Sequence, residues 1–193
     1  SKRYQEALSK RPRNLCGLSD AISYLKSLKQ VKFDQSMELH FNLNIDPRHA
    51  DQIVRGTFTL PHGTGKDIKI ICITKSEDID SLKEVGASEV GSDDLIDKIK
   101  SGWLDFDLVL ATPDSMVSLS KVARILGPRG LMPSQKNGTI TSDLKSAIVS
   151  FKSGKIEYKN DKTGNLHLVI GKSSFEEYKL IENFTAAYDT VVK

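Results

Sequence analysis

Residues 60–66, with the sequence LPHGTGK, contain the residue types of a phosphate-binding loop. A loop of the Walker type needs a glycine five positions before the glycine of its Gly-Lys pair, and Ser or Thr after the lysine. Leu60 and Asp67 occupy these two positions, so the ATPase interpretation fails within the sequence itself. We favour a glycine-rich connection between two domains, in which Gly63 and Gly65 mark one crossing of the chain and Gly154 marks the other.

Other catalytic and metal-binding patterns are also missing from the sequence. There is no GxGxxG dinucleotide fingerprint, no GxSxG nucleophile elbow and no HExxH pair. Asp105 and Asp107 flank Phe106 at the start of an expected strand, where solvated carboxylates are ordinary. Cys16 and Cys72 form no CxxC pair, and we expect both to be buried structural thiols. The sequence therefore favours a protein that is not an enzyme and has no cofactor or metal.

Residues 127–139, GPRGLMPSQKNGT, form a specified loop that carries Arg129 and Lys136. The two cations could contact RNA phosphates, or the loop could be a rigid element docked on its own domain. We favour the structural alternative and leave the RNA contact open.

Charge is unevenly distributed along the 193 residues. Residues 1–66 hold 11 Lys and Arg against 6 Asp and Glu, whereas residues 67–154 hold 11 against 13. This difference predicts that only the basic part meets a polyanion. The sequence has no apolar run long enough to span a membrane, and its first residues have no apolar signal-peptide core.

Periodicity changes twice along the chain. Residues 18–28 have helical spacing, and residues 37–45 and 57–60 alternate as strands of an antiparallel sheet with one wet side. Residues 68–74 and 106–111 are apolar runs typical of buried strands. Helices are expected at 79–85, 93–100, 116–126 and 143–151.

The first pattern then returns at the C-terminal end. Residues 155–159 and 166–170 alternate on either side of a turn at 160–165, and residues 175–192 form an amphipathic helix. We therefore predict an α+β fold in which a layered βα domain is inserted into a discontinuous two-layer domain.

Four blocks carry a resemblance to a known family: FDQSMELHFNLNIDPRHADQIVRGTFTLPHGTGK at 33–66, WLDFDLVLATPDSM at 103–116, ILGPRGLMPSQKNGTIT at 125–141 and KIEYKNDKTGNLHLVIGK at 155–172. In this order and spacing they resemble the L-one ribosomal proteins of the bacterial or organellar type. The resemblance implies a discontinuous RNA-binding domain, residues 1–65 with 155–193, and an inserted Rossmann-like domain, residues 66–154.

The resemblance also implies an RNA-facing surface on the first domain. Carried over by motif, it falls on Lys32, Phe33, Ser36, Glu38, His40, Asp161, Lys162, Thr163 and Gly164. Lysines would supply charge to phosphates, and Phe33 could pack on a ribose or base, or alternatively belong to the core. Carboxylates could accept from 2′-hydroxyls, although Asp161 could simply close its turn.

In function, the resemblance implies a component of the large ribosomal subunit that binds large-subunit ribosomal RNA in the mobile stalk beside the E site. It would contact E-site tRNA, aid release of deacylated tRNA and repress translation of its own operon mRNA. We expect a monomer when free, located on ribosomes in the cytoplasm or in an organelle. Two rivals are a nucleotide-binding enzyme, disfavoured by the missing fingerprint, and an RNA-binding regulator outside the ribosome.

Family members continue past the last helix into a strand with a Thr-Met-Gly-Pro-like turn that also touches RNA. The printed sequence ends at Lys193 before such a segment. Either the chain is shortened or this member lacks the segment, and in both cases we expect part of the family's RNA surface to be missing from residues 1–193.

Overall fold

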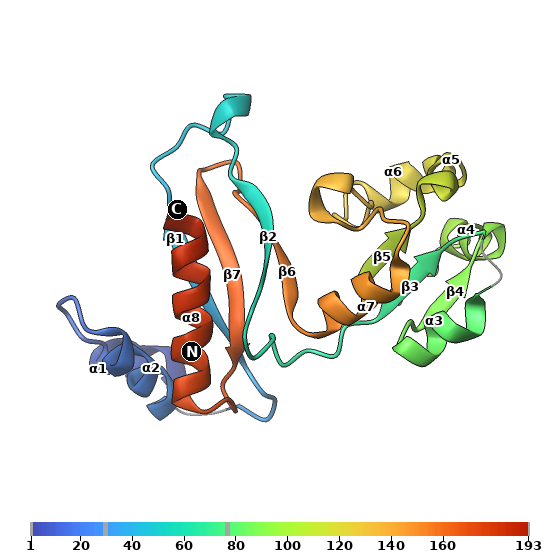
Figure 1. The fold of residues 1–193 in the computed structure, drawn as a ribbon. Helices are drawn as coiled ribbons and strands as arrows, with labels where there is room; N and C mark the ends of the chain where they lie inside the picture. Colours follow the sequence, from blue (N-terminus) through green and yellow to red (C-terminus); the bar gives the residue numbers. More distant parts are fainter. Residues whose placement is uncertain (1, 29–30, 76–77, 193) are drawn as a thin grey trace. The chain divides into compact units, whose positions relative to one another are not determined.

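The computed structural model describes residues 2–28, 31–75 and 78–192, and its elements form a mixed α/β fold (Figure 1). Contacts divide the chain into two compact units. Unit 1 contains Ser1–Val54, Leu60–Gly65 and Tyr158–Lys193, and unit 2 contains Arg55–Thr59 and Lys66–Glu157. The domain bounds expected from the sequence, at 65/66 and 154/155, remain a prediction.

Unit 1 is built on two long strands that are far apart in the sequence. Strand β1 (Ser36–Asn42) pairs antiparallel with β7 (Asn165–Lys172), and a bulge shifts the register between Met37 and Glu38. Along β1, Met37 is buried and its neighbours Ser36 and Glu38 are exposed. The alternation read from the sequence therefore places one face of this ribbon in the core and the other in solvent.

Helix α8 (Glu177–Val192) covers the apolar face of the ribbon (Figure 1). Leu166, Leu168 and Ile170 of β7 are buried, as are Leu180 and Ala187 of α8. Helix α2 (Leu18–Ser27) packs against α8 and buries Ile22. Because α8 lies on one side only, the opposite side of the ribbon is left for other contacts.

Two N-terminal features of unit 1 lie on its surface. Helix α1 (Lys2–Lys10) buries none of its residues, and Ala7 accepts a 2.6 Å hydrogen bond from the Tyr24 hydroxyl of α2. The segment between α1 and α2 has exposed side chains throughout, including Cys16. The expectation that both cysteines are buried is therefore wrong for Cys16. Cys72 is buried, and burial raises the pKa of its thiol to about 12.

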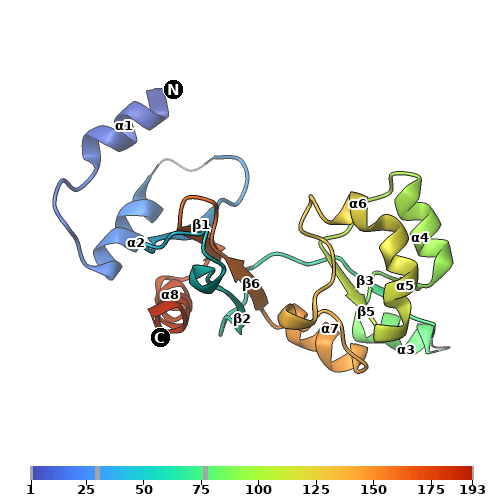
Figure 2. The ribbon, with the colours of Figure 1, turned by 90° about the horizontal axis from the view of Figure 1, so that it is seen from above.

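Unit 2 contains a parallel sheet in the order β4-β3-β5, from strands β3 (Ile70–Ile73), β4 (Glu89–Gly91) and β5 (Leu108–Ala111). Ile71 and Ile73 belong to one buried cluster, whereas Ile70 and Cys72 belong to another. Figure 2 shows helices on both sides of this sheet, as the two clusters require. The apolar runs in the sequence therefore mark strands buried on both faces.

The helices of unit 2 follow the expected order. They are α3 (Ile79–Val85), α4 (Asp93–Lys100), α5 (Met116–Leu119), α6 (Ala123–Leu126) and α7 (Leu144–Lys152). Short 3-10 turns lie at Pro113–Ser115, Ser120–Val122 and Gln135–Asn137 of unit 2, and another lies at Ala50–Gln52 of unit 1. The strands β2 (Arg55–Thr59) and β6 (Lys155–Lys159) form a separate two-stranded sheet.

Five details differ from the sequence-based expectations. The strands near 37–45 and 57–60 do not share a sheet, because β1 pairs with β7 and β2 pairs with β6. Strand β1 ends at Asn42, and the helix expected at 116–126 is interrupted by the 3-10 turn at Ser120–Val122. Strand β4 and helix α1 were not predicted.

No helix among the described residues is both long and apolar enough to cross a membrane.

Candidate nucleic-acid interface

The solvent side of the β1–β7 ribbon is lined by polar side chains. We call this surface the polar face and define it by Ser36, Glu38, His40, Asn42, Asn165, His167 and Lys172. Its residues lie in cross-strand register, with Ser36 opposite Lys172, His40 opposite His167 and Asn42 opposite Asn165. Glu38 lies opposite Val169, the one apolar residue in these pairs. An exposed face of donors and acceptors, bordered by charges, suits a polar macromolecule better than an apolar ligand.

Phe33 lies at the N-terminal end of the polar face, three residues before β1, and its side chain is 69% exposed. The core alternative for this ring is therefore wrong. The neighbouring Asp34 fixes the segment, since its carboxylate accepts from the Ser173 hydroxyl at 2.8 Å and from the backbone N–H of Ser174 at 3.1 Å. The Ser174 hydroxyl gives the strongest lowering of the Asp34 pKa, which keeps this anchor ionised.

Lysines border the same end of the polar face. Lys172 donates to the Ser36 hydroxyl at 3.0 Å, which ties β7 to the first residue of β1. Lys32 precedes Phe33 and is exposed. Cationic groups beside an exposed aromatic ring are the residue types that contact phosphates and bases in nucleic-acid interfaces.

The turn between β6 and β7 forms the other end of the polar face. The Asp161 carboxylate accepts hydrogen bonds from the backbone N–H groups of Thr163 and Asn165, each at 2.8 Å, and from the Thr163 hydroxyl. The Asn165 N–H, followed by the Thr163 hydroxyl, holds the pKa of Asp161 far below its ordinary value. Asp161 thus closes its own turn, while Lys162 is exposed beside it.

Gly164 adopts a left-handed conformation in this turn, with φ of 80°. A Cβ at this position would lie 2.9 Å from the carbonyl oxygen of Ile45, and the Gly164 carbonyl accepts a hydrogen bond from Leu43 N–H at 3.0 Å. Glycine is therefore required both by the backbone angle and by the close approach of residues 43–45.

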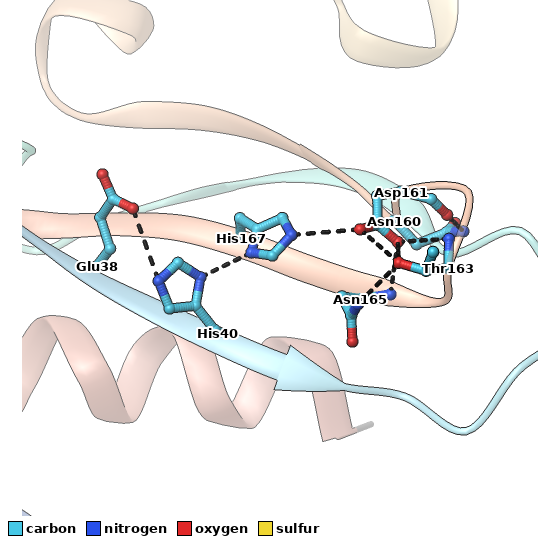
Figure 3. A network of polar contacts seen from close by, with 7 residues as sticks. All are labelled: Glu38, His40, Asn160, Asp161, Thr163, Asn165 and His167. Carbon is cyan, nitrogen blue, oxygen red and sulfur yellow. Dashed lines mark hydrogen bonds and ion pairs between the residues drawn. The ribbon is translucent and has the colours of Figure 1, made fainter.

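A row of contacts joins the middle of the polar face to the turn (Figure 3). His40 Nδ1 lies 2.7 Å from His167 Nδ1 across the strand pair. His40 Nε2 lies 3.7 Å from Glu38 Oε2, and His167 Nε2 lies 3.4 Å from Asp161 Oδ2. The two imidazoles therefore lie in a row between two carboxylates.

A hollow of about 820 Å³ adjoins the Ser36 end of the polar face. Helices α1 and α2 and the start of β1 line it, and its charged residues include Arg3 and Lys10 of α1 together with Glu6. The hollow thus continues from the Ser36 end of the polar face onto α1, where Lys10 pairs with Glu6 at 2.9 Å.

The structure brings part of the expected site together. Glu38 and His40 connect through His167 to Asp161 and Thr163, and Ser36 contacts Lys172. Sequence reasoning missed His167, Lys172, Asn42 and Asn165. Asn165 and His167 alternate in the sequence and so lie on one side of β7, whereas Lys172 is out of phase with them and reaches this side through the bulge. Only the pairing of β1 with β7 places all four residues on one surface.

The other candidate sites have structural partners. In the loop at 60–65, the buried Asn183 side chain accepts from His62 N–H at 3.0 Å and donates to the Gly63 carbonyl at 2.9 Å. Asp105 pairs with the Lys69 ammonium at 2.7 Å, and Asp107 pairs with Lys66. These contacts agree with a structural connection and with charge-paired carboxylates.

The loop at 127–139 is docked on its own unit. Leu131 and Met132 pack against one core cluster of unit 2, and the buried Thr139 hydroxyl accepts from Ser134 N–H at 2.7 Å. Arg129 and Lys136 are exposed on it. The geometry supports the structural alternative and leaves both cations accessible.

Comparisons with known proteins place the chain in a family. Residues 25–193 match the model of the Ribosomal protein L1p/L10e family. The chain belongs to this family. The large ribosomal subunit protein uL1 of Kosmotoga olearia is 50% identical over 194 residues, which cover 100% of this chain and 84% of that protein. The uL1 proteins of Persephonella marina and Bifidobacterium longum are 48% and 50% identical and cover 100% and 99% of the chain, with 81% and 84% of their own lengths matched.

Membership in this family confirms the resemblance drawn from the four sequence blocks, including its bacterial type. The family consists of ribosomal proteins, and the observed mixed α/β fold with small sheets agrees with it.

Proposed function

We propose that this protein is a structural component of the large ribosomal subunit and binds large-subunit ribosomal RNA through the polar face and its two ends. The observation that carries the proposal is the similarity along the whole chain. Proteins that are 50% identical to it, over 99–100% of this chain and 84% of their own length, bear the name large ribosomal subunit protein uL1. A component of an RNA-rich particle needs an RNA-binding surface, and the polar face has the residue types for one.

The chemistry of the polar face supports RNA as its ligand. RNA helices expose 2′-hydroxyls and base edges in a wide, shallow minor groove, which a flat polar surface can meet. Hydroxyl, amide and carboxylate groups on the polar face can exchange hydrogen bonds with these groups. Phe33 supplies an exposed ring for a ribose or an unstacked base, and Lys32 and Lys162 supply charge at opposite ends.

The domain arrangement belongs to the same proposal. Residues 1–65 with 155–193 would form a discontinuous two-layer RNA-binding domain, and residues 66–154 an inserted Rossmann-like domain. The parallel sheet of unit 2, with a core on each face, supports a layered inserted domain. The excess of Lys and Arg in residues 1–66 supports RNA binding by the first domain.

The finer roles follow the family resemblance. We propose that the protein forms part of the mobile stalk beside the E site, contacts E-site tRNA and aids release of deacylated tRNA. A messenger RNA that imitates the ribosomal site would be bound by the same surface, which would allow repression of the protein's own operon. We place the protein on bacterial-type ribosomes and expect a monomer when it is free.

Co-sedimentation tests the proposal against its rivals. The chain is added to large subunits that lack their own copy, and the fraction that pellets with them is measured. We expect stoichiometric pelleting, which a Lys32→Ala/Lys162→Ala variant reduces. A Lys98→Ala/Lys121→Ala variant makes the same charge change on unit 2 and should pellet normally. RNA binding without pelleting would favour a regulator outside the ribosome, and a thermal shift with nucleotides would favour the enzyme.

A further inference from the structure

The contact between His40 and His167 limits where their protons can lie. At 2.7 Å between the two Nδ1 atoms, one nitrogen must donate and the other must accept. Both imidazoles cannot be cationic in this arrangement, because two N–H groups would then point at each other. The contact therefore allows the neutral pair or a pair with one additional proton.

The neutral pair places a nitrogen lone pair beside a carboxylate at one end of the row. The imidazole that donates through Nδ1 has a lone pair on Nε2, and that lone pair would face the carboxylate beside it. Either tautomer has this defect, since Glu38 lies beside one Nε2 and Asp161 beside the other. One additional proton removes the defect, because both Nε2 atoms then carry hydrogen toward a carboxylate while the Nδ1 contact remains.

The surroundings of the pair are compatible with this proton. Its neighbours on the polar face are Glu38 on β1 and Asp161 in the turn, and Lys172 lies farther along β7 at Ser36. Helix α8 packs on the opposite, apolar face of the ribbon, where the Phe41 and Tyr188 rings meet at 6.4 Å between centroids. The hydrogen bonds that keep Asp161 ionised maintain negative charge at one end of the row.

The arrangement does not suit a metal ion. The two carboxylates lie beside the Nε2 atoms, whereas the nitrogens that face each other are the Nδ1 atoms. In the described part of the chain no group of three or more His, Cys, Asp or Glu side chains could hold a metal. The two imidazoles are therefore better placed to share a proton than to share a metal.

We propose that His167 is part of the RNA-binding surface together with His40, and that the two imidazoles share one additional proton which is taken up from solvent when RNA binds. This inference rests on the proposed function. Without the proton, RNA would meet the negative charges of Glu38 and Asp161 with no positive charge on the two imidazoles to offset them. With it, the pair contributes one positive charge between Glu38 and Asp161, so a polyanion favours the protonated state.

Proton uptake makes RNA affinity depend on pH in a defined direction. Histidine is the side chain whose ordinary charge change falls between about pH 5 and 8. Because the protonated pair is the form that binds, affinity is highest at low pH and falls as rising pH disfavours uptake of the proton. A single linked proton limits the change to about tenfold per pH unit.

The test compares RNA affinity from about pH 5.5 to 8.5 at fixed salt, using a fragment of large-subunit stalk RNA. Wild type is compared with His167→Gln, which keeps a hydrogen-bonding side chain but takes up no proton. His49→Gln, on an exposed loop of the same unit, is the matched control. Groups on the RNA titrate equally with all three proteins, so the difference between the profiles measures what His167 adds to proton uptake. If His167→Gln does not fold by circular dichroism, His40→Gln takes its place.

We expect wild type and His49→Gln to lose affinity with rising pH relative to His167→Gln, with a difference in slope of at most about one logarithmic unit per pH unit. Calorimetry in two buffers of different ionisation enthalpy should count up to one proton taken up by wild type and fewer by His167→Gln. Identical profiles for wild type and His167→Gln would overturn the inference, as would a slope difference well above one.

A second measurement separates this inference from the proposed function. In the free protein, proton NMR of the two imidazoles over a pH series should show that one added proton is shared by both rings. Independent protonation of each ring, with the contact intact, would overturn the shared proton. If RNA binding were equally weak for specific and scrambled RNA at every pH, the proposed function and its RNA linkage would fail, whatever the NMR titration shows.

Discussion

At each end of the polar face, a carboxylate holds the local backbone in place by accepting hydrogen bonds from nearby residues. Asp34 holds the segment of Phe33 against Ser173 and Ser174, and Asp161 holds the turn of Thr163. These carboxylates shape the surface, while exposed neighbours such as Phe33 and Lys162 can reach a ligand. Positioning and contact are thus divided between adjacent residues.

Replacing Phe33 tests whether this exposed residue contacts the RNA. The Phe33→Ala variant should weaken specific RNA binding by about 1–3 kcal/mol, the range for loss of one base-stacking ring. Folding should be little affected, because the ring is exposed. Filter binding and circular dichroism measure the two effects. Tyr178→Ala, another exposed ring of unit 1, is the control. Wild-type affinity in a folded Phe33→Ala variant would remove this residue from the interface.

Replacing Asp161 tests whether this carboxylate stabilises the turn between β6 and β7. Its pKa is lowered in the folded protein, so it contributes stability above its ordinary unfolded pKa of about 3.9, and this contribution is lost as pH falls through the lowered value. Asp161→Asn should therefore be less stable than wild type near neutral pH, and the difference should vanish in strong acid. Urea unfolding at a series of pH values measures it. Asp67→Asn, at an exposed position outside the turn, should show no such convergence. A difference independent of pH would contradict this role.

The elements that carry the site are two strands whose partners are distant in the sequence. Alternation at 37–45 and 166–170 correctly predicted the exposed and buried sides of β1 and β7. It could not predict their pairing, because alternation fixes which side a residue faces and not which strand lies next to it. Helices with clear ends, such as α3 and α4, match the prediction. The short strand β4 has only three residues and too little periodicity to be recognised.

The turn between β6 and β7 gives an element-scale prediction. Gly164→Ala adds a Cβ close to the Ile45 carbonyl and strains a left-handed residue, which costs about 1–2 kcal/mol for the backbone alone. Gly130→Ala has nearly the same φ but meets no atom within 4 Å, so it measures the backbone cost without the clash. Thermal unfolding should show Gly164→Ala as the less stable variant, with weaker RNA binding. Equal stabilities would mean that residues 43–45 can move away without cost.

Across the whole molecule, net charge distinguishes the N-terminal part of the sequence from the middle part. Residues 1–66 carry a net charge of +5 and residues 67–154 a net charge of −2. The expected site residues all fall in unit 1. This asymmetry was visible in the sequence, whereas the cross-strand contact of His40 with His167 was not, because it required the pairing of two distant segments.

Removing the middle of the chain tests this asymmetry. A chain that joins residues 1–63 to 155–193 through a short glycine linker should retain most of the RNA affinity. The reason is that the removed residues are mildly acidic and hold none of the expected contacts. Filter binding is measured after circular dichroism has shown that the shortened chain folds. A folded chain that has lost its affinity would indicate that Arg129 or Lys136 contacts the RNA directly.

The central claim is that the protein recognises a specific ribosomal RNA structure through the polar face. The most direct measurement is its affinity for large-subunit stalk RNA and for a scrambled RNA of equal length, over a range of salt concentrations. Affinity for both should fall as salt rises, because phosphate contacts release counterions. The preference for the stalk RNA should persist at high salt, because hydrogen bonds and stacking do not depend on that release. Equal affinities with equal salt dependence would show that binding is only electrostatic and would contradict the account.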